Sequence, residues 1–97
     1  MTIWFHPEAE AEHLETVAYY EARRPGLGAH YLAAFEQALK AVGADPHRFR
    51  IVQEPDTRRA PLARFPLSII YRETRERIEI LAVAHHKRRP AYWIARS

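Results

Sequence analysis

The chain has 97 residues, a formal net charge of +3 at pH 7 and no cysteine, so we expect one small domain over residues 1–97 without disulfides or thiolate chemistry. No apolar run approaches the roughly 20 residues that span a bilayer, and the N-terminus lacks the basic and apolar regions of a signal peptide. We therefore expect a soluble, cytoplasmic protein without a membrane partner.

The first elements predicted are a short strand and a helix. Thr2–Phe5 is apolar and has strand propensity. Pro7 and the glutamates after it are typical of a helix start, because the first turn leaves N–H groups unused and its dipole favours acidic side chains. We expect this helix to run from about Pro7 to Arg23, where Arg24-Pro25-Gly26 stops it. Its buried stripe is predicted to comprise Ala11, Leu14 and Ala18, with Val17 beside them.

A second helix is predicted from Leu27 to about Gly43. Its apolar residues show the clearest helical periodicity in the chain: Leu27, Tyr31, Ala34, Phe35, Ala38, Leu39 and Val42. The short connection at 24–26 makes the two helices an antiparallel hairpin. The apolar face of this hairpin must cover another layer of the fold.

Two apolar runs in the second half of the chain predict a β-hairpin. Phe65–Tyr71 and Ile78–Ala84 are too short for typical helices, and the polar segment 72–77 joins them. Side chains alternate along a strand, so the second strand is expected to place four residues on one face: Ile78, Ile80, Ala82 and Ala84.

The order of elements predicts an α+β fold, β-α-α-β-β-β, in which a small antiparallel sheet packs against an N-terminal helical hairpin. Segment 46–57 is expected to be a loop or irregular strand, and Arg58–Leu62 a strand that Pro61 restricts to an edge or a bulge. Tyr92–Arg96 is expected to form a last helical turn. Whether the first strand pairs at the edge of the sheet or inside it stays open.

Charges of opposite sign are separated along the chain. Residues 1–57 carry 5 Lys or Arg and 9 Asp or Glu, whereas residues 58–97 carry 10 and 3. The basic half favours an anionic partner, either nucleic acid or an acidic protein segment. The alternative is a solvated strand edge decorated with arginine, which is common on small soluble domains.

Several short motifs together resemble one family. They are Pro7-Glu8-Ala9-Glu10-Ala11-Glu12, Tyr19-Tyr20, Gly26-Leu27-Gly28, Arg64-Phe65-Pro66, Ile70-Tyr71-Arg72, and an apolar strand ending in His85 with Arg88-Arg89-Pro90 and Tyr92-Trp93. In this combination and order, the chain resembles the RelE/ParE superfamily of toxins from type II toxin–antitoxin modules, also called plasmid stabilisation proteins. The resemblance covers almost the whole chain.

The resemblance implies a growth-inhibiting toxin that a cognate antitoxin neutralises. The RelE-like branch cleaves mRNA on the ribosome without a metal, whereas the ParE-like branch binds and inhibits DNA gyrase. The ribonuclease pattern has an arginine three residues before the tyrosine of the hairpin's first strand, where this chain has Ser68. We therefore favour gyrase inhibition and keep the ribosome-dependent endoribonuclease as the alternative. A third hypothesis is a basic module that binds nucleic acid directly, with an affinity that falls steeply with salt.

The resemblance also assigns candidate site residues. For the ribonuclease alternative, His86 and Tyr92 are the candidate catalytic residues. For binding of the target or the antitoxin, the candidates are Arg58, Arg59, Arg64, His85, Arg88, Arg89, Tyr92 and Trp93. The alternatives are that His85 bonds to a backbone group while His86 is solvated, and that Trp93 folds back on the helices and closes the core.

No cofactor or metal is expected. His85 and His86 are adjacent, and neighbouring residues on a strand point to opposite faces, so they cannot share one tetrahedral metal site there. The only glycines are Gly26, Gly28 and Gly43, which do not form a phosphate-binding loop.

Overall fold

The computed structural model describes residues 2–96 of the chain. Its elements are β1 (Thr2–Phe5), α1 (Pro7–Arg23), α2 (Leu27–Ala44), β2 (Arg50–Gln53), β3 (Thr57–Pro61), β4 (Leu67–Glu73), β5 (Arg77–His85) and a final 3₁₀ turn (Ile94–Arg96). Both predicted helices, the central hairpin and the last helical turn are confirmed. The segment expected to be a loop or irregular strand contains β2, so the sheet has one strand more than predicted. Because β3 pairs with both β2 and β4, it does not lie at the edge that Pro61 suggests.

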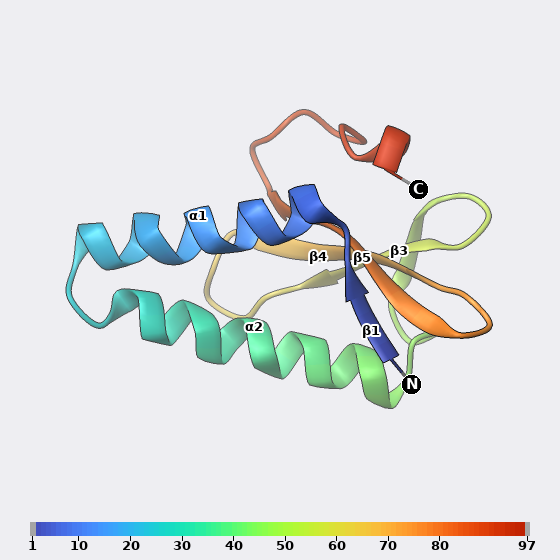
Figure 1. The fold of residues 1–97 in the computed structure, drawn as a ribbon, viewed down its shortest axis with the longest axis horizontal. Helices are drawn as coiled ribbons and strands as arrows, with labels where there is room; N and C mark the ends of the chain where they lie inside the picture. Colours follow the sequence, from blue (N-terminus) through green and yellow to red (C-terminus); the bar gives the residue numbers. More distant parts are fainter. Residues whose placement is uncertain (1, 97) are drawn as a thin grey trace.

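The five strands form one open sheet in the order β1-β5-β4-β3-β2, and the two helices cover one of its faces (Figure 1). The α+β class is confirmed. The sheet is mixed, not purely antiparallel, because β1 runs parallel to β5, with Thr2 opposite Arg77 and Phe5 opposite Ile80. The pairing continues past the strand, where the His6 N–H donates to the Ile80 carbonyl at 2.9 Å. The first strand therefore lies at an edge.

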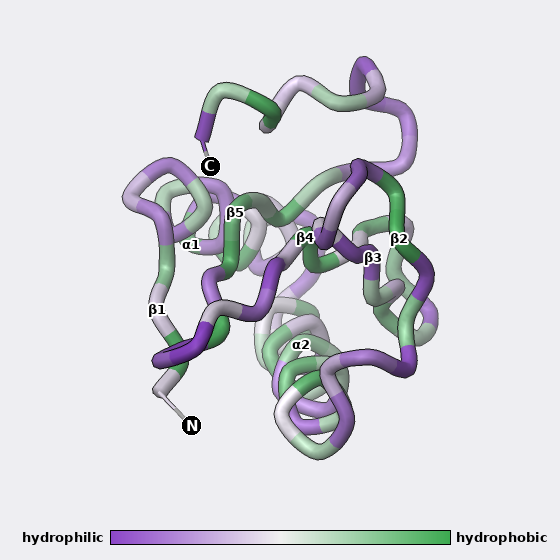
Figure 2. The backbone as a smooth tube through the Cα atoms, turned by 90° about the vertical axis from the view of Figure 1, so that its right-hand side faces the viewer, coloured by the Kyte–Doolittle hydropathy of each residue, from purple (hydrophilic) through white to green (hydrophobic). Residues whose placement is uncertain are grey.

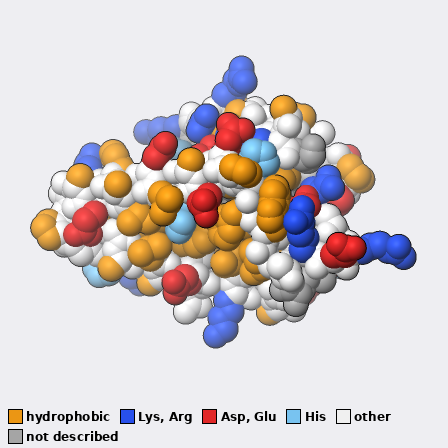
Figure 3. All heavy atoms as spheres, in the orientation of Figure 1, with side chains coloured by type: hydrophobic (Ala, Val, Ile, Leu, Met, Phe, Trp, Pro, Cys, Tyr) orange, Lys and Arg blue, Asp and Glu red, His pale blue; other side chains and the backbone are white. Residues whose placement is uncertain are grey.

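Helix α1 buries a different stripe from the predicted one. Ala9 is fully buried and Val17 packs against the core, whereas Leu14 is 61% exposed and its predicted neighbours Ala11 and Ala18 are not in the core. The buried stripe includes His13, which sequence patterning treats as polar. Figure 3 shows apolar side chains along the helical hairpin, with acidic side chains between them.

His13 is accommodated by a polar partner and by aromatic rings. Its Nδ1 lies 2.9 Å from the Tyr31 hydroxyl, and its ring centroid lies 4.1 Å from that of Phe35. A hydrogen bond removes most of the cost of burying a polar ring. The prediction that Ala11, Leu14 and Ala18 are buried is wrong. Helix α1 has a second stripe with Ala9, His13 and Val17, and this stripe is buried because His13 bonds to Tyr31 of α2.

A β-bulge in β5 changes which residues share a face. Ile70 pairs with Ala82 and Tyr71 with Ile80, which leaves Leu81 as an extra residue without a partner on β4. Ile80 therefore lies in the core under the helices, whereas Leu81 and Ala82 lie in a second core on the other face. The predicted face, with Ala82 and Ala84 beside Ile80, is wrong because one inserted residue reverses the alternation.

The C-terminal segment, residues 86–96, covers the sheet face that the helices leave open (Figure 2). Trp93 is 9% exposed and packs in the second core with Ile70, Leu81 and Ala82. The alternative expected from the sequence is that Trp93 closes the core against the helices. Trp93 does close a core, but it lies on the opposite side of the sheet from the helices.

Within residues 2–96, neither helix is both long and apolar enough to cross a membrane. No three His, Asp or Glu side chains of this range gather in an arrangement that could hold a metal ion.

Replacing Gly28 with alanine tests how closely the two helices approach. A Cβ at this position would lie 3.0–3.1 Å from the Glu21 side chain and the Val17 carbonyl oxygen. We expect Gly28→Ala to lower the free energy of unfolding by about 1 kcal/mol, because crowding outweighs the gain in helix propensity. Gly43→Ala is the matched control in the same helix, where nothing lies within 4 Å of the added Cβ. It should raise stability by up to about 1 kcal/mol. Chemical denaturation measures both, and equal effects of the two changes would refute the close contact.

His13 makes stability depend on pH. Burial lowers the pKa of His13 from its ordinary value of 6.5, against a smaller opposing effect of Glu10. Below pH 6.5 the unfolded chain binds a proton that the folded chain resists, so the free energy of unfolding falls as the pH drops. We expect denaturation experiments between about pH 8 and about pH 5 to show a smaller decrease in the free energy of unfolding for His13→Gln than for the parent protein. His30→Gln, at an exposed position of α2, should keep the parent slope. If the free energy of unfolding of His13→Gln fell with pH as steeply as that of the parent protein, His13 would not be the cause of the pH dependence.

Candidate partner-binding surface

Glu12 of α1 connects three parts of the fold. Its Oε1 accepts the Val83 N–H at 2.9 Å and the Arg96 Nη1–H at 3.0 Å, while its Oε2 accepts Arg96 Nη2–H at 3.0 Å and Arg88 Nη1–H at 3.2 Å. The side chains of Glu12 and Arg96 are 11% and 8% exposed. Two guanidinium groups and a backbone amide thus share one nearly buried carboxylate. This arrangement attaches the C-terminal segment to α1 and β5.

Tyr92 lies between the two arginines of this junction. The guanidinium carbon of Arg88 lies 3.8 Å from the Tyr92 ring centroid, and that of Arg96 lies 5.0 Å from it. Its hydroxyl oxygen is buried and has no hydrogen-bond partner among the described residues. Burial, and then the neighbouring Glu12, raise the pKa of Tyr92. The phenol therefore stays protonated at neutral pH, and its ring contacts both guanidinium groups.

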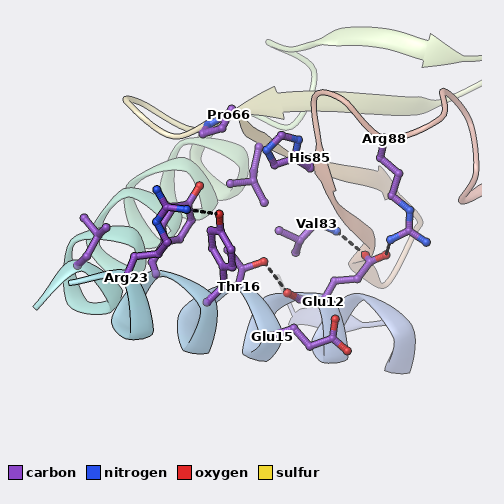
Figure 4. Close-up of a pocket in the computed structure, with 12 residues that line it drawn as sticks. Glu12, Glu15, Thr16, Arg23, Pro66, Val83, His85 and Arg88 are labelled. Atoms are coloured by element: carbon purple, nitrogen blue, oxygen red, sulfur yellow. Dashed lines mark hydrogen bonds and ion pairs between the residues drawn. The ribbon is translucent and has the colours of Figure 1, made fainter. Parts of the chain in front are cut away.

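A cavity of about 580 Å³ opens between α1 and the end of the central hairpin (Figure 4); we call it the helix-side cavity. Thr16, Tyr19, Tyr20 and Arg23 line it from α1, and Pro66, Leu67, Val83 and His85 line it from the hairpin. Arg88 and Glu12 close one end. The floor is apolar, while Arg23, His85 and Arg88 lie around it together with the carboxylates of Glu12 and Glu15. Such a mixture fits an amphipathic protein segment.

A second cavity, of about 270 Å³, lies on the sheet face opposite the helices; we call it the back-face cavity. Here His86 Nε2 lies 3.0 Å from the Ser68 hydroxyl and 3.3 Å from Arg59 Nη2. Burial, and then the positive charge of Arg59 and the neighbouring His85 ring, lower the pKa of His86. Ser68 is 1% exposed, although sequence alternation alone does not mark it as polar core.

The structure separates the predicted site residues into groups. Five of them line the back-face cavity: Arg59, His85, His86, Arg88 and Trp93. Arg58 does not, because its guanidinium donates to the carbonyls of His47 and Phe49 and holds the chain before β2 against β3. Arg64, with a φ of 69°, and Arg89 are exposed outside both cavities. Their binding roles stay predictions.

The two candidate catalytic residues lie in different surroundings. His86 lines the back-face cavity, whereas Tyr92 lines neither of the two cavities and its hydroxyl is covered. His85 also behaves as a loop-stabilising residue, since its Nδ1 accepts the Lys87 N–H at 3.1 Å. The catalytic roles of His86 and Tyr92 stay predictions.

Sequence reasoning missed two residues that organise this region, Glu12 and Ser68. Glu12 lies in a run of alternating glutamates, which is explained equally well as a helix start. Ser68 stands out in the sequence only as a departure from the ribonuclease pattern. The one signal that points to Glu12 is the separation of an acidic half from a basic half, which does not say which charges meet.

An open mixed sheet with a helical hairpin on one face and a cationic C-terminal segment on the other defines a toxin fold of the RelE/ParE superfamily. The model of the family described as "ParE toxin of type II toxin-antitoxin system, parDE" matches residues 3–90, which is most of the chain, so the chain belongs to this family.

A comparison with solved structures found the same fold in "Chromosomal ParDE TA system from P. aeruginosa". The two chains have a TM-score of 0.75 and 20% sequence identity, and the match covers 88% of this chain and 95% of that chain. A search of curated proteins found no match.

Removing the Glu12 carboxylate tests whether it holds the C-terminal segment. Glu12→Ala leaves Arg96 nearly buried without its main partner and the Val83 amide without an acceptor. We expect the free energy of unfolding to fall by about 3 kcal/mol. Glu15→Ala, at an exposed position one turn along α1, should change it by less than about 0.5 kcal/mol. Urea denaturation measures the free energy of unfolding of both variants. If Glu12→Ala lowered it as little as Glu15→Ala, Glu12 would not hold the C-terminal segment in place.

Proposed function

We propose that this chain inhibits growth by binding DNA gyrase, and that a cognate antitoxin neutralises it by occupying the same region. The observation that carries the proposal is the helix-side cavity, whose apolar floor is flanked by Arg88 and by Arg23, which has no carboxylate partner in residues 2–96. Membership of the ParE toxin family supports the toxin role. The similar solved structure comes from a ParDE toxin–antitoxin system, which supports a cognate antitoxin for this chain.

The cavity indicates the features expected of the antitoxin segment. Apolar side chains of the partner would pack on Leu67 and Val83, and on the Tyr20 ring beside them. Acidic side chains would meet Arg23 and Arg88 at the two ends of the cavity. An amphipathic helix presents such a pattern on one face. Of these two arginines, Arg88 is already paired with Glu12, whereas Arg23 has no carboxylate partner in residues 2–96. We therefore expect Arg23 to contribute more to binding of the antitoxin.

The ribonuclease alternative is supported by one observation, the contact of His86 with Ser68 and Arg59. A neutral imidazole beside a guanidinium can take a proton while the cation stabilises a phosphorane. The expected second proton-transfer group is Tyr92, and its covered hydroxyl does not share this cavity. This separation is why we rank gyrase binding first.

The first experiment measures gyrase supercoiling and trapped cleaved DNA with the purified protein, and mRNA integrity on translating ribosomes with the same preparation. We expect gyrase inhibition with intact mRNA. Cleaved mRNA with unaffected gyrase would overturn the proposal and favour the ribonuclease.

A charge reversal tests the cationic C-terminal segment within the gyrase assay. Arg89 is exposed and makes no ion pair among the described residues, so Arg89→Glu should leave the fold intact. We expect the concentration for half-inhibition to rise roughly fivefold, because a rim charge contributes about 1 kcal/mol. Arg75→Glu makes the same charge change at an exposed position in the β4–β5 turn and should have little effect. Equal effects would indicate a general charge effect and contradict a specific surface.

A further inference from the structure

The back-face cavity is distinct from the helix-side cavity to which the proposed antitoxin contact is assigned. It lies on the other face of the sheet, beneath the C-terminal segment. Arg59 comes from β3, Ser68 from β4, and His86 directly follows β5, so three adjacent strands bring these side chains together. No Asp or Glu is among the described residues that line the cavity.

The charges in this cavity are not balanced from within. In residues 2–96, Arg59 has no carboxylate at ion-pair distance, and its side chain contacts His86 instead. Arg88 reaches the rim, but Glu12 already neutralises it. The positive charge of Arg59 is therefore available to an anion that enters the cavity.

The hydrogen bonds of His86 are also incomplete. Arg59 can only donate, so its contact requires an unprotonated Nε2 with a single lone pair. The Ser68 hydroxyl lies at 3.0 Å from the same nitrogen and would compete for that lone pair as a donor. If Nε2 is protonated, it can donate to Ser68, but Arg59 is then left without an acceptor. An anionic oxygen beside these groups would accept from Arg59 and leave Nε2 of His86 to bond with Ser68, which satisfies all three groups.

The remainder of the cavity is apolar and aromatic. Trp93 forms one wall, and Val52, Ile70, Ala84 and Pro90 complete the apolar part. The indole nitrogen of Trp93 is buried without a hydrogen-bond partner among the described residues. An inorganic anion would use only the cationic end. The volume of about 270 Å³ fits a ligand with one anionic group and one flat apolar ring system, near the lower limit for small-molecule sites.

We propose that the back-face cavity binds a nucleoside monophosphate, with its phosphate on Arg59 and His86 and its base against Trp93. A phosphomonoester carries close to two negative charges at neutral pH and offers three acceptor oxygens, which match the N–H donors of a guanidinium and of a neutral imidazole. A base is planar and packs on aromatic side chains. The enclosed size of the cavity favours a mononucleotide over an internal segment of a nucleic-acid strand.

The test is a titration of the full ¹⁵N-labelled chain with adenosine 5′-monophosphate, followed by NMR. The chain has two tryptophans, Trp4 and Trp93, so two indole N–H signals report independently. We expect the Trp93 signal to shift with a dissociation constant below about 1 mM, while the Trp4 signal stays in place. Inorganic phosphate alone and adenosine alone should each bind at least about tenfold more weakly, because each uses one end of the cavity.

Variants identify the anion contact. Arg59→Gln should weaken binding of the nucleotide about tenfold or more, since a charge-assisted hydrogen bond is lost. His86→Gln should weaken it as well, and it provides a second test if Arg59→Gln does not fold. Arg75→Gln removes the same charge at the opposite end of the hairpin and should bind like the parent chain.

Three results would overturn the proposal. The first is no Trp93 shift with the nucleotide, and the second is equal weakening by Arg59→Gln and Arg75→Gln. The third is a 5′-phosphorylated oligonucleotide that binds far more tightly than the mononucleotide and loses affinity steeply with salt, which would indicate an extended nucleic-acid surface. Because this readout needs neither gyrase nor an antitoxin, its failure is distinguishable from failure of the proposed function.

Discussion

One nearly buried carboxylate, that of Glu12, determines how the parts of this small protein are held together. It accepts hydrogen bonds from the β5 backbone and from two arginines that follow the last strand. Breaking a buried pair costs more than forming it contributes, because the remaining charge is left without solvent or partner. The C-terminal segment therefore stays over the open face of the sheet, and both cavities depend on that position.

The ion pairs of Glu12 also reduce the positive charge that the basic half of the chain presents to a partner. Part of the basic half is neutralised inside the molecule, since Arg88 and Arg96 pair with glutamates of the acidic first helix. The surface cations left for a partner are fewer than the sequence count indicates. Of the arginines without a carboxylate partner in residues 2–96, Arg23 lines the helix-side cavity and Arg59 lines the back-face cavity.

The two faces of the sheet suit different ligands for a physical reason. On the helix side, α1 and the open end of the central hairpin leave a partly apolar opening that fits an amphipathic protein segment. On the back face, the bulge at Leu81 turns Ala82 and Ala84 towards the second core, and the small side chain of Ala84 lines the cavity beside Trp93. The two proposed ligands would therefore bind on opposite faces of the sheet.

The sequence by itself determined the helices, the central hairpin, the α+β class and the family resemblance, because these follow from local periodicity, helix-stop residues and short motifs. It did not determine which stripe of α1 is buried, since His13 becomes a core residue only when Tyr31 and Phe35 surround it. Tertiary structure likewise decided the parallel pairing of β1, the bulge in β5 and the junction at Glu12. Each of these depends on contacts between residues far apart in the chain, and no local pattern encodes their partners.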